Sequence, residues 1–65
     1  MLLFDCLEKA EKALEGLGLE KAEKDKLAAA CAKFLYLGGN TREGLEDALK
    51  EAGLEGYADR IWQAL

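Results

Sequence analysis

The chain has 65 residues, which is enough for one small domain and too few for two. Charged residues make up 34% of it and the net charge is −4, which excludes a membrane-embedded protein and opposes a nucleic acid partner. Histidine and serine are absent and Thr41 is the only aliphatic hydroxyl, so the sequence offers no imidazole base and no serine nucleophile. We therefore expect one non-catalytic domain over residues 1–65.

Apolar residues recur at intervals of three and four from Leu3 to Leu17, and this spacing predicts a first helix over about residues 2–15. Gly16 follows as a helix-ending residue. Phe4 falls outside the apolar stripe, beside acidic residues on the helical wheel. An aromatic residue outside a core is typical of interfaces, which makes Phe4 a candidate interface residue.

The second predicted helix, over residues 20–37, is apolar almost all round in its C-terminal half. One face carries residues such as Leu27 and Phe34, while Ala29, Ala32 and Tyr36 lie on the opposite face. A helix that is apolar all round is normally buried on more than one side. The sequence therefore predicts that this helix lies at the centre of the domain.

A third helix is predicted over residues 41–52. Asn40, with Glu43 three residues later, has the pattern of a capping box at its start. Gly53 followed by Leu54 has the pattern of a Schellman-type end.

The fourth helix is predicted over residues 55–64, with Tyr57 and Ile61 directed inward and Trp62 at the edge of the apolar stripe. With the glycine-rich turns between them, the four segments predict an all-α fold. It is a compact four-helix bundle made of two αα-hairpins.

The segment from Phe34 to Leu49 resembles the inner turn of a tetratricopeptide hairpin, although Gly44 stands where that family prefers alanine. The segment from Leu54 to Ile61 is similar to a helix of SAM- or death-like interaction modules. Ala, Leu, Glu and Lys fill 40 of the 65 positions of the whole chain. In this reduced alphabet the chain resembles computationally designed or synthetic helical bundles. That resemblance implies a scaffold without catalysis.

Cys6 and Cys31 lie at similar distances before and after the turn between the first two helices, so they should face each other. A disulfide is one interpretation, and it is useful in a small domain. A metal pair is another, but a metal needs about four ligands and the sequence does not complete the set. We favour the third, two thiols packed as core residues. No metal or other cofactor is expected.

The predicted partner is a second copy of the chain. The candidate interface residues are Phe4, Ala29, Ala32, Tyr36 and Trp62. The alternative is a small natural prokaryotic or phage interaction module, which binds a partner protein through an apolar helix face. Neither a targeting signal nor an apolar run of about 18 residues is visible, so we expect a cytoplasmic protein with no membrane partner.

Overall fold

The computed structural model describes residues 3–65, and within them the chain is all-α. The elements are α1 (Leu3–Ala13), α2 (Lys21–Tyr36), α3 (Arg42–Glu51), the 3₁₀ turn η1 (Glu55–Tyr57) and α4 (Ala58–Ala64). The predicted all-α four-helix bundle is confirmed.

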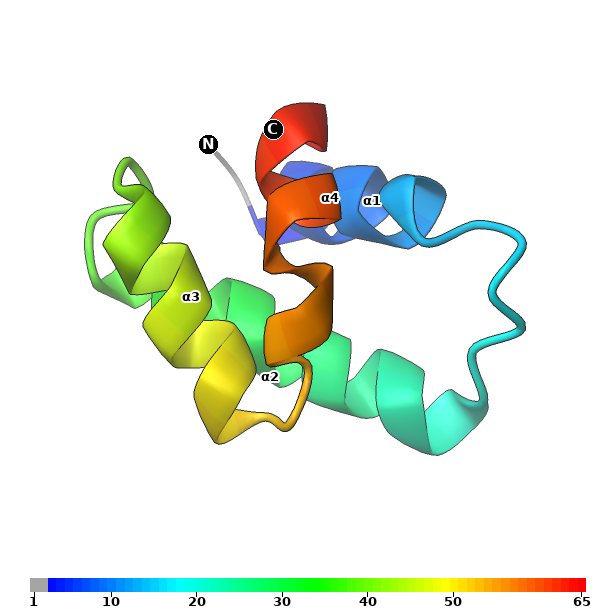
Figure 1. Cartoon of the computed structure of the whole chain (residues 1–65). Coiled ribbons are helices and arrows are strands. Elements are labelled where there is room, and N and C mark those ends of the chain that lie inside the picture. Colours follow the sequence, from blue (N-terminus) through cyan, green and yellow to red (C-terminus); the bar gives the residue numbers. More distant parts are fainter. Residues whose placement is uncertain (1–2) are drawn as a thin grey trace.

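The four helices pack in a closed ring (Figure 1). Helix α1 contacts α2 and α4, and α3 contacts the same two helices from the other side. Consecutive helices therefore form the hairpins α1–α2 and α3–α4, and the contact between α1 and α4 joins the two hairpins.

The core lies inside this ring, and every helix contributes to it. Its buried residues are Cys6, Ala10, Leu14, Leu27, Ala30, Cys31, Phe34, Leu45, Ala48, Leu49, Leu54, Ala58 and Ile61. No buried polar or charged side chain is found among the described residues. The core is therefore held by apolar burial alone.

The outer helices are shorter than predicted. Helix α1 ends at Ala13 rather than residue 15, and its predicted start at residue 2 lies outside the described residues. Leu14 remains buried although it follows the helix. The first turn of the predicted fourth helix is the 3₁₀ turn η1, which contains Gly56, a weak α-helix former.

The expectation that α2 lies at the centre is wrong. One face of α2 is buried through residues such as Leu27 and Phe34, but Ala29, Ala32 and Tyr36 on the opposite face are exposed. Helix α3 packs against the flank of α2, and α4 packs against α1 and α3 instead. The outer face of α2 is thus left without a covering helix.

Helix α3 is capped by Thr41 and not by Asn40. Thr41 has an extended backbone, and its hydroxyl oxygen accepts a hydrogen bond of 3.1 Å from the backbone N–H of Gly44. At the other end, the N–H of Leu54 donates to the carbonyl of Leu49, and the N–H of Gly53 donates to that of Lys50. These two bonds define the predicted Schellman end.

Candidate functional site

The outer face of α2 carries a continuous stripe of exposed residues. The stripe consists of Ala22, Asp25, Ala29, Ala32 and Tyr36. Their spacings are three, four, three and four residues, which is the pattern of a seam between two paired helices. The sequence analysis found the last three residues and missed the first two. The same spacing rule would have found them if it had been applied to this face.

Two exposed aromatic side chains lie beside this stripe or at its end. Tyr36 is 89% exposed at the C-terminal end of α2, and Phe4 is 84% exposed on α1, which packs along α2. Leu3 and Leu37, in the same two helix ends, are about half exposed. Apolar surface is therefore concentrated where the start of α1 meets the end of α2.

Trp62 differs from the other candidate interface residues. It is only partly exposed on α4 and packs against the core. The structure thus gathers Ala29, Ala32 and Tyr36 on one helix face and places Phe4 on a neighbouring helix, but it places Trp62 on α4, which does not contact α2.

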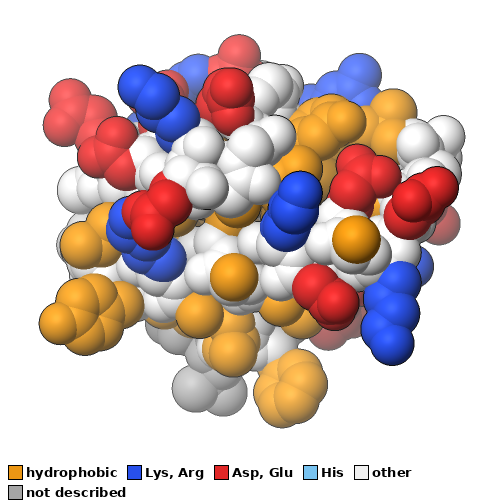
Figure 2. Space-filling view, turned by 90° about the horizontal axis from the view of Figure 1, so that it is seen from below, with side chains coloured by type: hydrophobic (Ala, Val, Ile, Leu, Met, Phe, Trp, Pro, Cys, Tyr) orange, Lys and Arg blue, Asp and Glu red, His pale blue; other side chains and the backbone are white. Residues whose placement is uncertain are grey.

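Figure 2 shows the molecule from below, the side on which α2 lies in Figure 1. Hydrophobic side chains, including ring-shaped ones, lie at the lower left and along the lower edge of this view, and another group lies at its upper right. Acidic and basic side chains lie between and around these groups, and few of them reach the lower edge.

The exposed ion pairs lie around α3 and away from the stripe. Lys33 of α2 pairs with Glu51 of α3. Arg42 pairs with Glu46 at 3.1 Å and also with Asp59 of α4. Exposed pairs of this kind contribute at most about 1 kcal/mol each. These pairs connect α3 to α2 and to α4, and none of them covers the outer face of α2.

Cys6 and Cys31 form a second candidate site inside the core. They are free thiols, 0% and 2% exposed, and their side chains are hydrogen bonded to each other. Burial, together with the side-chain bond to Cys6, raises the pKa of Cys31 to about 12. Burial also raises the pKa of Cys6, but the bond from Cys31 and the charge of Lys9 act in the opposite direction.

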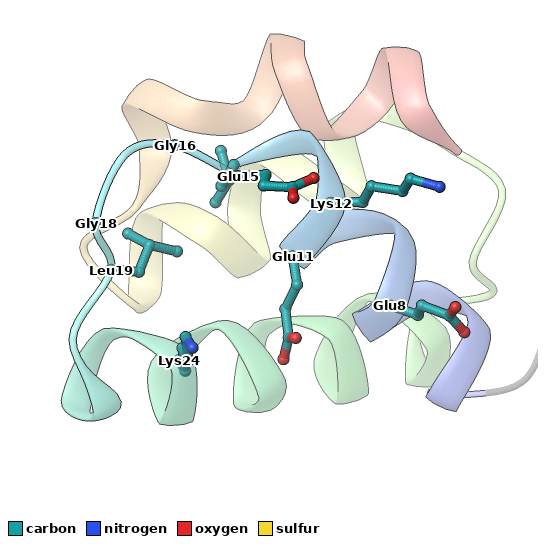
Figure 3. Close-up of a pocket in the computed structure, with 9 residues that line it drawn as sticks. Glu8, Glu11, Lys12, Glu15, Gly16, Gly18, Leu19 and Lys24 are labelled. Carbon is teal, nitrogen blue, oxygen red and sulfur yellow. The ribbon is translucent and has the colours of Figure 1, made fainter.

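A wide, open hollow lies between the end of α1, the following loop and α2 (Figure 3). Glu11 points from α1 towards α2, and Leu19 and Lys24 lie on the opposite side of the hollow. Its lining mixes acidic and basic side chains, none of which is buried. This hollow does not assemble a group of ligands or a paired acid and base.

Over residues 3–65 no three or more Cys, Asp or Glu side chains are arranged to hold a metal ion. None of the helices within that range is long and apolar enough to cross a bilayer.

Comparison with known proteins returned no matching protein-family model, no matching curated protein and no matching solved structure.

Proposed function

We propose that the chain is a non-catalytic helical scaffold that self-associates as a homodimer through the outer face of α2. The observation that carries this proposal is the exposure of Ala29, Ala32 and Tyr36 on a helix whose other face is fully buried. A small domain commonly completes its apolar burial by oligomerising, and two-fold dimers are the commonest solution. The partner is thus a second copy of the same face.

An antiparallel pairing of the two α2 helices fits the charges best. If the two-fold axis passes close to Ala29, the two Asp25 side chains lie at opposite ends of the seam, and Tyr36 of each copy lies over Ala22 of the other. A parallel pairing would instead bring the two Asp25 side chains together, which is unfavourable. The alanines of the stripe allow the helix axes to approach to about 8 Å.

The dimer should be weak because its surface is small. Helix α2 has 16 residues and is therefore about 24 Å long. One helix face with Phe4 and Tyr36 beside it is at the low end of specific interfaces, below about 1,200 Å² in total. We expect a dissociation constant in the micromolar range.

The proposal includes a designed or synthetic origin, which rests on the sequence. Four residue types fill 40 of the 65 positions, and the glycines Gly16, Gly18, Gly38, Gly39 and Gly53 have positive φ in the loops. Strong helix formers joined by glycine turns are what design heuristics prescribe. Discovery of a natural homologue of the same length would contradict this part of the proposal.

The test of the interface is light scattering at high micromolar concentration on the wild type and on the double variant Ala32→Glu with Tyr36→Glu. The wild type should have a mass above that of one 7.1 kDa chain, and the double variant should be monomeric. Two charges placed in the seam would be buried without partners in the dimer, so association should be lost.

The matched control is Ala64→Glu, an exposed alanine on α4, outside the proposed seam. This variant should associate like the wild type. A double variant as dimeric as the wild type would contradict the proposed interface. A monomeric wild type would contradict self-association and favour the alternative, a module that binds a different partner through the same helix face.

A further inference from the structure

Cys6 and Cys31 form a pair with no competing partner within the chain. They are its only two cysteines, so only one intramolecular disulfide can form. The two thiols come from adjacent helices, α1 and α2, and belong to the same buried cluster. Helices α1 and α2 pack against each other, and the two thiols are close enough to affect each other's pKa.

We propose that this pair is a protected dithiol site, which a small-molecule disulfide such as oxidised glutathione converts into a Cys6–Cys31 bridge that fastens α1 to α2. The inference does not depend on self-association. Burial keeps the site reduced for as long as the helices stay closed, because neither thiol is accessible to a reagent.

The chemistry is a two-step thiol–disulfide exchange. In the first step the thiolate of one cysteine attacks the reagent disulfide, a mixed disulfide of that cysteine with glutathione forms, and one glutathione thiolate leaves. In the second step the thiolate of the other cysteine attacks the cysteine sulfur of the mixed disulfide, the protein bridge forms, and the second glutathione thiolate leaves. The two protons lost by the cysteines pass to the glutathione thiolates. Two protein thiols are thus oxidised and one glutathione disulfide is reduced.

Separation of α1 from α2 is the opening that exposes the two thiols to the reagent, because each lies on the buried face of its own helix.

Closure of the ring should be far more favourable in the folded chain than in the unfolded one. The fold already holds the two sulfur atoms together, whereas in the unfolded chain they are joined by a flexible loop of about 25 residues. The equilibrium constant for the bridge, measured against the glutathione couple, should therefore be on the order of a hundredfold higher in buffer than in denaturant.

The experiment incubates the full chain with mixtures of oxidised and reduced glutathione, starting once from the reduced protein and once from protein bridged in denaturant. Samples are alkylated and their intact mass is measured. We expect both starting points to reach a monomeric chain lighter by two hydrogen atoms, with the tryptic peptides 1–9 and 27–33 linked. The approach from the reduced side should be faster in sub-denaturing urea, and the bridged chain should melt at a higher temperature.

Cys31→Ala is the control, because it retains Cys6 and cannot form the bridge. Its melting temperature should not rise on oxidation. The proposal is overturned if the wild type ends with two glutathione adducts, or if the bridge is no more favourable in buffer than in denaturant.

Discussion

At residue 44 the backbone of α3 passes close to the hydroxyl group that caps it. A Cβ atom added at Gly44 would lie 2.9 Å from Oγ1 of Thr41 and 3.9 Å from Cδ1 of Phe34. Gly44 is also the donor of the capping hydrogen bond to Thr41. Glycine in the middle of a helix normally costs about 1 kcal/mol relative to alanine. Here it is required by the close contact with the cap.

Gly44→Ala should therefore fail to stabilise the protein, with a loss of up to about 1 kcal/mol, because the gain in helix propensity is offset by displacement of the Thr41 cap. The control is Gly56→Ala, where the added Cβ would meet no atom within 4 Å. That change should be neutral or stabilise by up to about 1 kcal/mol. Urea unfolding followed by circular dichroism measures both. An equal gain at the two positions would contradict this explanation of Gly44.

Phe34 and Leu49 are the side chains whose truncation should be most harmful, since each is 1% exposed in the core. Phe34→Ala and Leu49→Ala should each cost about 2–5 kcal/mol through the cavity that they leave. A core of this size supplies about 3–5 kcal/mol in total, so either variant should be largely unfolded. Tyr36→Ala on the exposed face should change the free energy of unfolding by less than about 0.5 kcal/mol at low protein concentration. If both core variants melt at the same temperature as the wild type, Phe34 and Leu49 do not lie in the core.

The buried thiols should make stability depend on alkaline pH. The pKa of Cys31 is raised by burial from its ordinary value of 9.0 to about 12, so the folded state keeps its proton at a pH where the unfolded state loses it. Below pH 9 the Cys31 thiol is protonated in both the folded and the unfolded state, so it has no effect on how stability changes with pH. Above pH 9 stability should fall, by about 2 kcal/mol at about pH 10.5.

The measurement is the urea midpoint between about pH 7 and pH 10.5, in the presence of a reducing agent. Cys31→Ala is the control, because it removes only this thiol and retains every other residue of the chain. Its midpoint should fall less than that of the wild type. Equal falls in the two proteins would show that the Cys31 thiol is not buried in solution.

At the scale of the elements, the sequence predicts where helices lie better than which residue caps them. Asn40 and Thr41 are both good N-cap residues and adjacent in sequence, and Glu43 favoured the first as part of a capping box. The N-cap is the residue that has an extended backbone immediately before the first helical turn. In α3 this residue is Thr41, with φ −123° and ψ 141°. Glu20, which forms a capping box with Glu23 at the start of α2, was missed because glutamate is an uncommon N-cap.

Thr41→Ala should destabilise the protein by about 1 kcal/mol, because it leaves the N–H of Gly44 without its acceptor. Thr41→Ser keeps the hydroxyl group and should retain most of the stability. Asn40→Ala should have little effect. Chemical unfolding of the three variants tests the assignment. A larger loss of stability for Asn40→Ala than for Thr41→Ala would show that Asn40 is the cap, as the sequence predicted.

At the scale of the whole molecule, helical periodicity was enough to predict an all-α bundle of two hairpins. It was not enough to predict which helix is central. The pattern of α2 shows that both its faces are apolar, but the position of α4 depends on packing between residues far apart in sequence, such as those that join α1 to α4. The exposed position of Tyr36 and the half-buried position of Trp62 follow from that packing and could not be read from the sequence.

The same limit applies to the thiols. Their similar distances from the turn predicted that Cys6 and Cys31 face each other, and the structure places both in one buried cluster between α1 and α2. Sequence spacing therefore located the pair, and only the structure shows that both thiols are free and buried.

The central claim, self-association through the outer face of α2, is tested most directly by following backbone amide chemical shifts of the wild type on dilution from millimolar to low micromolar concentration. The account predicts that the shifts of Ala29, Ala32 and Tyr36 change along one two-state curve, while those of Asp47 in α3 and Glu55 in η1 stay constant. Spectra that do not change with concentration would contradict self-association. Concentration-dependent shifts confined to α3 and α4 would contradict the proposed face.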